Sequence, residues 1–323
     1  MKAAICTAYG APDVVRVIDV PAPVPKPNDV LIRVHATTVS SGDARIRGAN
    51  FPPGFSIPAR LFLGLTRPRK PVLGTELAGL VEAVGQNVTR FQKGDRVFAF
   101  PGVAMGCHAE LKVMPHDGAI ALMPPDFSFE EAAAIAFGGT TALYFLRDVA
   151  NVQRGEKVLI NGASGAVGSA AVQLAKHYGC HVTGVCSAAN AALVRTLGAD
   201  EVIDYNASDF AAPGLTWDVI LDTVGNAPFA RSKTALNKDG RLLIIAASLG
   251  ELVKAPFQSK MSGLKVAGGP APERAQDIEV LRQLCEAGAF KPVIDSCFPL
   301  DRICDAHARA DTHRKVGSVV VTL

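Results

Sequence analysis

A glycine-rich segment at residues 158–168 carries the clearest chemical signal in the sequence, Val-Leu-Ile-Asn-Gly-Ala-Ser-Gly-Ala-Val-Gly. It begins as a short apolar strand and continues as small residues that open a helix. Ala163 and Gly165 leave room for a dinucleotide pyrophosphate, and Gly168 lets the helix pack closely on the strand. The N–H groups of the first helical turn attract phosphate. The order is Ala-x-Gly-x-x-Gly rather than the strict Gly-x-Gly-x-x-Gly, so a tight turn that binds no ligand is the alternative.

The end of the next strand bears on which dinucleotide this turn binds. Proteins that prefer NAD place Asp or Glu about 20 residues beyond the glycines, where it binds the ribose 2′-hydroxyl. Here residues 184–190 read Gly-Val-Cys-Ser-Ala-Ala-Asn, with no acid before Asp200. Ser187 and Asn190 could donate hydrogen bonds to a 2′-phosphate, so we expect NADPH rather than NADH. No Arg or Lys stands beside them, and both residues also suit a helix cap with either cofactor.

Alternating strand and helix patterns position this turn from about residue 127 onward. The alternation predicts βαβ units and a doubly wound parallel sheet, whereas the first 120 or so residues read as short strands separated by Gly and Pro. Strands are predicted at 30–36, 79–85, 96–100, 158–161, 181–186, 202–205, 217–222, 242–247 and 316–322, and helices at 170–176, 190–197, 227–236, 273–287 and 301–311.

The stretch between Asn50 and Pro71 is too rich in proline for a long regular element. We expect a surface excursion that could cover a pocket. The candidates for an apolar substrate wall are Phe51, Phe55, Phe62 and Phe100, although packing alone would also account for each.

Composition excludes several classes of protein. The 323 residues predict two domains, and 49 % hydrophobic with 20 % charged residues excludes a disordered chain. The net charge of +3 is too small to predict a nucleic-acid or anionic-membrane partner. No apolar run approaches the roughly 20 residues that cross a bilayer, and the first residues lack the apolar core of a signal peptide. Seven cysteines without a CxxC pair do not predict a disulfide framework, so we expect a cytoplasmic protein.

Further short motifs, each found once, are spread along the whole chain. They are Ser-Ser-Gly-Asp-Ala-Arg-Ile-Arg at 40–47, Gly-Thr-Glu-Leu-Ala-Gly at 74–79, Phe-Gln-Lys-Gly-Asp-Arg-Val at 91–97, Gly-Gly-Thr-Thr-Ala at 138–142, Leu-Gly-Ala-Asp at 197–200 and Asp-Thr-Val-Gly at 222–225. With these motifs the chain resembles the medium-chain dehydrogenase/reductase superfamily, specifically its zinc-free quinone oxidoreductase branch.

The resemblance implies an α/β fold with three parts. Residues 1–124 form a GroES-like, mostly β catalytic domain, and residues 125–262 form a Rossmann domain that binds NADP. Residues 263–323 complete the sheet edge and return to the catalytic domain. Relatives commonly form homodimers by pairing the edges of their Rossmann sheets, so a homodimer is expected here.

Zinc-dependent members of this superfamily place a Cys near the Ser40 motif and a His directly after Gly74. This chain has Ser40 and Thr75 there and lacks the four closely spaced cysteines of the structural-zinc lobe. Hydroxyl groups are poor zinc ligands, so no metal is expected. The pairs Cys107-His108 and Cys180-His181 do not stand at the family positions.

The expected absence of zinc narrows the chemistry. An unactivated ketone or alcohol needs a Lewis acid worth several kcal/mol, whereas quinones and α,β-unsaturated carbonyl compounds delocalise the charge that hydride transfer creates. The resemblance therefore implies NADPH-dependent reduction of a small hydrophobic quinone or enone. Zinc-free oxidation of alcohols by NAD(P), or a non-catalytic protein that binds NADPH for a structural or interaction role, are the alternatives.

The resemblance also implies candidate catalytic residues. In related reductases the motif at Ser40 reads Asn-Pro-x-Asp near the nicotinamide; here Ser40 replaces the Asn, and Asp43 retains the acid. Ser40 could donate to the substrate oxygen or the carboxamide, or simply bond its own backbone. We expect Asp43 and Arg47 to form an ion pair that fixes the loop. His108 is a candidate proton donor, with a hydrogen-bonded packing residue as the alternative.

The cofactor contacts combine the glycine-rich turn with positions that the resemblance supplies. They are Thr140, Gly162, Ala163, Ser164, Gly165, Ala166, Val167, Gly168, Ser187, Asn190, Tyr205, Val224, Gly225, Ala247 and Ser248.

Overall fold

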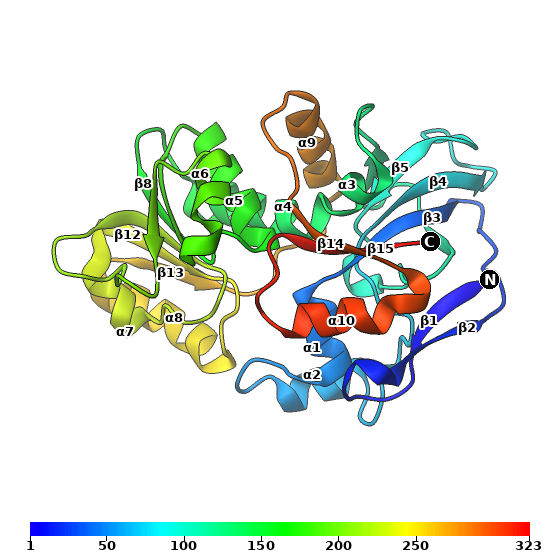
Figure 1. Ribbon diagram of the computed structural model, residues 1–323, viewed down its shortest axis with the longest axis horizontal. Helices are drawn as coiled ribbons and strands as arrows, with labels where there is room; N and C mark the ends of the chain where they lie inside the picture. The colour runs from blue at the N-terminus through cyan, green and yellow to red at the C-terminus, as the bar shows by residue number, and fades with distance from the viewer. The chain divides into compact units, whose positions relative to one another are not determined.

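Six parallel strands form the sheet that carries the glycine-rich turn, in the order β10-β9-β8-β11-β12-β13. This is the order 3-2-1-4-5-6 of a doubly wound nucleotide-binding sheet, so the predicted fold class is confirmed. The order reverses between β8 and β11, where such sheets bind their ligands. The strands are β8 (Lys157–Asn161), β9 (His181–Cys186), β10 (Glu201–Asp204), β11 (Trp217–Asp222), β12 (Leu236–Ile244) and β13 (Lys265–Gly268). Of these strands, β8, β12 and β13 are labelled in Figure 1.

Helices cover this sheet, and its central strands are accordingly apolar. Val158, Leu159 and Ile160 of β8 are fully buried, as expected for a parallel strand with helices on both faces. The helical segments are α4 (Ala136–Leu143), a π-helical turn (Tyr144–Ala150), α5 (Ala166–His177), a 3₁₀ turn (Ala188–Asn190), α6 (Ala191–Thr196), α7 (Phe229–Ser232), a 3₁₀ turn (Lys233–Ala235) and α8 (Leu249–Ser262).

A second sheet has the order β14-β15-β3-β4-β5-β7, with β6 also paired to β3. All its pairs are antiparallel except β14 with β15. A separate hairpin joins β1 to β2. The strands are β1 (Lys2–Cys6), β2 (Val15–Asp19), β3 (Asp29–Val39), β4 (Leu77–Val84), β5 (Arg96–Ala99), β6 (Leu111–Pro115), β7 (Ile120–Leu122), β14 (Ile294–Pro299) and β15 (Ser318–Thr322).

Short helices accompany this second sheet. Side chains of α10 pack with β15 in one apolar cluster that includes Ile303, Ala306 and Val319. The helical segments are a 3₁₀ turn (Pro12–Val14), α1 (Ser41–Gly48), α2 (Ser56–Leu63), a 3₁₀ turn (Gly102–Ala104), α3 (Phe129–Ala133), α9 (Ala275–Glu286), a 3₁₀ turn (Leu300–Arg302) and α10 (Ile303–Asp311). No helix combines the length and the apolar character that crossing a bilayer requires.

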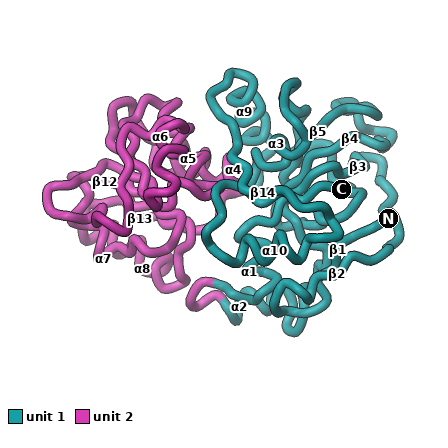
Figure 2. Tube along the Cα trace, viewed as in Figure 1, with its two compact units in different colours: residues 1–51, 56–137, 273–323 teal, residues 52–55, 138–272 magenta.

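The computed structural model describes residues 1–323, and these divide into two compact units (Figure 2). Unit 1 contains residues 1–51, 56–137 and 273–323, and unit 2 contains residues 52–55 and 138–272. Residues 125–137 thus fall with the mostly β unit, because Phe129 of α3 stacks on His35 of β3 at 4.4 Å between ring centroids. Residues 263–272 fall with unit 2, because β13 pairs with β12.

One predicted element differs clearly from the structure. The helix expected at 227–236 is only α7 and a 3₁₀ turn, and Leu236 already belongs to β12. Leu236 pairs with Trp217 of β11, with a register irregularity directly after it. Sheet pairing therefore ends the helical segment earlier than its apolar spacing predicts.

Candidate functional site

The glycine-rich turn joins β8 to α5 at the centre of the parallel sheet. Gly162 has φ +83°, and a Cβ there would lie 2.5 Å from Thr223 Oγ1. A Cβ on Gly168 would lie 2.0 Å from the carbonyl oxygen of Gly162, so the helix approaches the turn as closely as backbone allows. Gly165 differs, since its nearest neighbour would be an ordinary contact at 3.5 Å. Gly162 and Gly168 are thus required by the fold, while Gly165 leaves open space.

The N-terminus of α5 presents free backbone donors beside that space. Gly165 is the N-cap residue and makes no side-chain cap. The first helical N–H that bonds within the chain is that of Ser169, which donates to the Gly165 carbonyl at 2.8 Å. The N–H groups of Ala166, Val167 and Gly168 therefore remain available, together with the positive end of the helix dipole. This arrangement suits a pyrophosphate.

The loop after β11 is organised by a buried carboxylate, Asp222. Its Oδ1 accepts from the N–H groups of Val224 at 2.9 Å and Gly225 at 3.0 Å, and Oδ2 accepts from Ala227 at 2.9 Å. Asn161 Nδ2, at the end of β8, also donates to Oδ1 at 2.9 Å. Asp222 therefore joins the two loops on either side of the point where the strand order reverses. Its role was not identified from the sequence, although an acid ending an apolar strand was the available signal.

The residues expected around a 2′-phosphate lie together at the carboxyl ends of β9 and β10. Asn190 Nδ2 donates to Ser164 Oγ at 3.1 Å, which ties this segment to the glycine-rich turn. Ser187 makes no side-chain cap, so its hydroxyl is not used by the helix that follows. Tyr205 is exposed, and its N–H donates to the Cys186 carbonyl. No carboxylate ends β9.

Three other predicted cofactor residues occupy the same unit. Thr140 lies buried in α4, and α4 approaches α5 closely because a Cβ on Gly138 would lie 2.5 Å from the Ala166 carbonyl oxygen. Ala247 is buried just beyond β12. Ser248 is the N-cap of α8, where its hydroxyl accepts from Glu251 N–H at 3.2 Å. Ser248 is thus engaged in capping.

In unit 1, Ser40 and Asp43 form a capping box at the start of α1. Ser40 Oγ donates to Asp43 Oδ2 at 2.6 Å, and Asp43 N–H donates back to Ser40 Oγ at 3.1 Å. Asp43 Oδ1 also accepts from Gly74 N–H at 2.9 Å. Both side chains are buried. The geometry favours a positioning role, in which Asp43 fixes the Ser40 and Gly74 segments against one another.

The expected ion pair between Asp43 and Arg47 is wrong. Arg47 is buried and pairs with Asp311 of α10, with Nη2 2.6 Å from Oδ1. It also donates to the Gly10 carbonyl. Because Asp43 is engaged by backbone N–H groups and Ser40, the Arg47 guanidinium pairs with Asp311 instead.

His108 is fully buried and linked through Thr38 to a carboxylate that sequence reasoning missed. His108 Nε2 lies 2.9 Å from the Thr38 carbonyl oxygen, and since a carbonyl only accepts, Nε2 carries the proton in the neutral ring. The Thr38 hydroxyl donates to Glu76 Oε1, and Phe137 N–H donates to Oε2 at 2.6 Å. The His108 Nδ1 atom has no partner, and His307 lies edge-on to the His108 ring with centroids 5.8 Å apart.

Glu76 is the group in unit 1 best suited to exchange a proton near neutral pH. Burial raises its pKa to about 7, the nearby Asp43 carboxylate adds to the rise, and hydrogen bonds from Thr38 and Phe137 oppose it. Lys315 also opposes it, and burial lowers the pKa of Lys315 to about 8. In the sequence, the apolar residues around Glu76 at 73–78 were the signal that this carboxyl group is buried.

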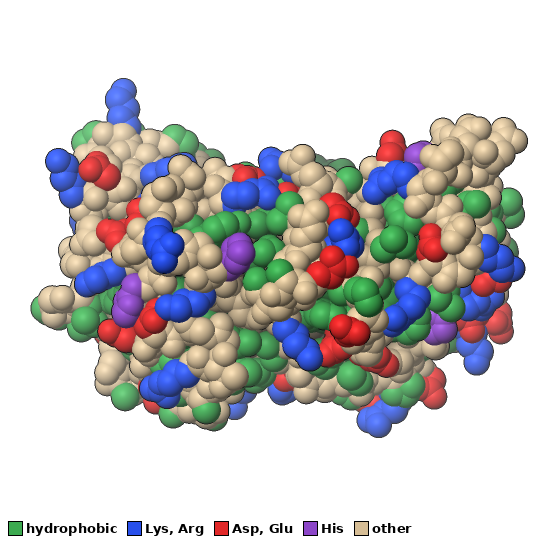
Figure 3. All heavy atoms as spheres, turned by 90° about the horizontal axis from the view of Figure 1, so that it is seen from above, with side chains coloured by type: hydrophobic (Ala, Val, Ile, Leu, Met, Phe, Trp, Pro, Cys, Tyr) green, Lys and Arg blue, Asp and Glu red, His purple; other side chains and the backbone are tan.

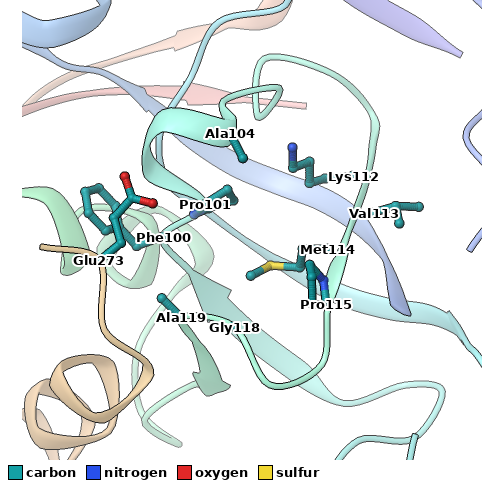
Figure 4. A pocket seen from close by; sticks show the side chains of 10 residues that line it. All are labelled: Phe100, Pro101, Ala104, Lys112, Val113, Met114, Pro115, Gly118, Ala119 and Glu273. Carbon is teal, nitrogen blue, oxygen red and sulfur yellow. The ribbon is translucent and has the colours of Figure 1, made fainter. Parts of the chain in front are cut away.

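A cavity of about 220 Å³ lies elsewhere in unit 1 (Figure 4). The Lys112 amine and the Glu273 carboxylate lie at opposite sides of it, and Phe100 is the one residue of the predicted apolar wall that it contains. It is smaller than the roughly 300–1,000 Å³ of typical ligand pockets. Its lining residues are Phe100, Pro101, Ala104, Lys112, Val113, Met114, Pro115, Gly118, Ala119 and Glu273.

The positions that hold zinc in related enzymes carry hydroxyl groups here. The Ser40 hydroxyl is bonded to Asp43, and the buried Thr75 hydroxyl has no partner. Neither is a good zinc ligand. No group of three or more His, Cys, Asp or Glu side chains has a metal-binding arrangement.

Two segments of the chain match families of known proteins. Residues 26–152 match the family described as the alcohol dehydrogenase GroES-like domain, and residues 197–321 match the family described as zinc-binding dehydrogenase. The quinone oxidoreductase of Homo sapiens is 30 % identical, over 95 % of this chain and 93 % of that protein.

Solved structures agree over the full length. The quinone oxidoreductase from Coxiella burnetii is 28 % identical, with a TM-score of 0.88 over 100 % of this chain and 99 % of that one. A mycobacterial protein solved in complex with NADPH is 27 % identical, with a TM-score of 0.82 over 100 % of both chains.

Proposed function

Because the chain belongs to the medium-chain dehydrogenase/reductase superfamily, in its zinc-free quinone oxidoreductase branch, we propose that this oxidoreductase reduces quinones or α,β-unsaturated carbonyl compounds with NADPH. The observation that carries the proposal is the open turn at Gly165, beside three helical N–H groups without acceptors, in a sheet whose strand β9 ends without a carboxylate. A pyrophosphate fits the first feature, and a 2′-phosphate fits the second.

The residues that would hold NADPH all belong to unit 2. The N–H groups of Ala166, Val167 and Gly168 bind the pyrophosphate, and Ser187, Asn190 and Tyr205 surround the 2′-phosphate. When bound, NADPH supplies the hydride. Thr140, Val224, Gly225, Ala247 and Ser248 complete the proposed contacts to the nicotinamide and adenosine halves.

Unit 1 supplies the proposed groups for the acceptor. Asp43 positions the Ser40 and Gly74 segments, and Thr38 connects Glu76 with His108. Burial raises the pKa of the Glu76 carboxyl to about 7, so it can hold a proton near neutral pH, while the Thr38 carbonyl accepts from His108 Nε2–H and so orients the His108 ring without passing it a proton. This role for Glu76 is that of a positioning and proton-holding residue.

The preferred acceptor follows from the groups at the zinc positions. Ser40 and Thr75 cannot polarise a carbonyl as a Lewis acid does, so the acceptor must itself delocalise the developing charge. Quinones and enones do so, whereas simple ketones do not.

The test is NADPH oxidation at 340 nm with 9,10-phenanthrenequinone, an alkenal and a simple ketone in parallel, with NADH as the second donor. Turnover of the first two acceptors with NADPH, unchanged by EDTA, is the expected result. Reduction of the ketone, or oxidation of an alcohol with NAD, would instead establish an alcohol dehydrogenase. NADPH binding without turnover of any acceptor would establish a non-catalytic cofactor-binding protein.

A further inference from the structure

The helix α2 directs its apolar side chains away from unit 1 rather than into it. Ile57, Leu61 and Phe62 share one side of the helix, and Leu65 lies two residues beyond its end. Their exposed fractions are 74, 58, 70 and 62 % respectively. Leu63, on the opposite side, packs against the core of unit 1. An amphipathic helix normally buries its apolar side, so this exposed set, here called the α2 surface, requires another environment.

The orientation of the α2 surface is fixed by contacts on its inner side. Tyr9 OH donates to the Gly64 carbonyl at 2.7 Å, and the Arg60 guanidinium lies 5.2 Å from the centre of the Tyr9 ring. Arg69 N–H donates to the Leu63 carbonyl at 2.6 Å. The outward direction of the apolar side chains is therefore part of the folded structure of unit 1, at whose rim α2 lies (Figure 2).

The chain segment that contains α2 carries charge of a single sign. Residues 44–75 contain six Arg and Lys residues and no Asp or Glu. Four of these cations, Arg60, Arg67, Arg69 and Lys70, are exposed, and none of the four pairs with a carboxylate. By contrast, the face drawn in Figure 3 mixes Lys and Arg with Asp and Glu. The net charge of +3 therefore conceals a local cationic region.

We propose that the α2 surface binds an anionic lipid bilayer, with Ile57, Leu61, Phe62 and Leu65 entering the boundary between headgroups and acyl chains. A short helix with apolar side chains on one side and cations around them is the arrangement that interfacial segments use. The exposed cations of the same chain segment complement an anionic headgroup layer. This interaction does not depend on the reductase reaction, and it differs from the expectation of no membrane partner that the net charge gives.

The experiment is cosedimentation of the full chain with sucrose-loaded vesicles of phosphatidylcholine alone or with 30 % phosphatidylglycerol. We expect binding to the anionic vesicles that weakens with added salt, and little binding to the neutral ones. A Leu61→Trp variant adds a second measurement, because the one native Trp, Trp217, is buried. Its emission should shift to the blue with anionic vesicles and be quenched by brominated acyl chains.

Matched variants separate the apolar and charged contributions. Ile57→Ser/Leu61→Ser should abolish binding, and Arg67→Gln/Arg69→Gln should weaken it about 25-fold, at roughly fivefold per cation near an anionic surface. Val24→Ser and Lys233→Gln/Lys238→Gln remove exposed groups elsewhere and should bind like the wild type. Equal thermal midpoints confirm that all variants fold.

Three outcomes would overturn the proposal. If the wild-type protein does not bind anionic vesicles, a bilayer is excluded as the partner of the α2 surface. Equal losses in the test and control variants would show adsorption by net charge alone. Binding without quenching at Leu61→Trp would place the contact elsewhere and leave α2 for a protein partner or for covering a substrate.

Discussion

Arg47 of α1 and Asp311 of α10 form an ion pair between residues 264 positions apart in the chain. The Arg47 side chain is 1 % exposed, and Asp311 is 39 % exposed. The pair therefore joins α1, which begins at the capping box of Ser40 and Asp43, to α10, the last helix of unit 1.

Replacing Asp311 by Asn should destabilise unit 1, because it leaves a buried guanidinium without its counterion. We expect a loss of about 2–3 kcal/mol in the free energy of unfolding, since the Gly10 carbonyl still accepts from Arg47. Urea denaturation measures it. Asp305→Asn breaks the exposed pair with Arg302 and should cost under about 0.5 kcal/mol. Equal effects would contradict a special role for the buried pair.

Acid should destabilise the protein through His307. Its side chain is fully buried with neither ring nitrogen bonded, and burial holds its pKa well below the usual 6.5. Above pH 6.5 the ring is neutral in both states and has no effect on stability. Below it the unfolded chain binds a proton that the folded chain does not, so stability falls by up to about 1.4 kcal/mol per pH unit.

The comparison of His307→Leu with wild type checks this expectation. The slope of unfolding free energy against pH between 6.5 and 5 should be shallower in the variant, whereas His177→Gln, an exposed site, should leave it unchanged. Parallel pH profiles for His307→Leu and wild type would show that other groups govern acid unfolding.

Gly165→Val should weaken NADPH binding without harming the fold. A Cβ at this position meets only an ordinary contact, so the fold accepts a side chain there, and that side chain competes with the proposed pyrophosphate. We expect the dissociation constant to rise about tenfold or more, or at least 1.4 kcal/mol, in a titration of NADPH fluorescence. Gly250→Val is the control, because a Cβ there also meets open space. Unchanged affinity in Gly165→Val would place the nucleotide elsewhere.

Ser187→Asp should reverse the nucleotide preference. A carboxylate at the end of β9 repels a 2′-phosphate and accepts from a ribose 2′-hydroxyl. The ratio of kcat/KM for NADPH over NADH should fall by about a hundredfold, while Ser187→Ala should lower it by about tenfold or less, since one hydrogen bond is worth roughly 1 kcal/mol. If Ser187→Asp leaves the ratio of kcat/KM for NADPH over NADH unchanged, the 2′-phosphate does not bind at this position.

The homodimer expected from the resemblance has a definite test in unit 2. Strand β13 pairs only with β12, and the neighbouring helix α8 exposes Val253, Phe257 and Met261 at spacings of four residues. We expect a second copy to cover this helix side and strand edge. Phe257→Asp should reduce the mass in light scattering from twice 33.8 kDa to 33.8 kDa, and Val24→Asp should not. A wild-type protein with the mass of a monomer would contradict this interface.

Local sequence determined the parallel sheet and the glycine-rich turn. The apolar run at 158–160 and the small residues after it need no distant partner to specify a buried strand and a tight turn, and strand 181–186 was predicted with its observed bounds. The requirement for glycine at Gly168 is also local, because the carbonyl it would meet belongs to Gly162.

Tertiary structure alone decided the partners of the buried charges. Arg47 lies four residues from Asp43, which is the spacing of a helical ion pair, yet it bonds Asp311 because backbone N–H groups already engage Asp43. The pKa of Glu76 depends on Thr38, Phe137 and Lys315, which only folding assembles. Likewise, the proline-rich stretch between Asn50 and Pro71 predicts only a surface excursion, and which side of the short helix α2 meets the core is set by Tyr9 and its contacts.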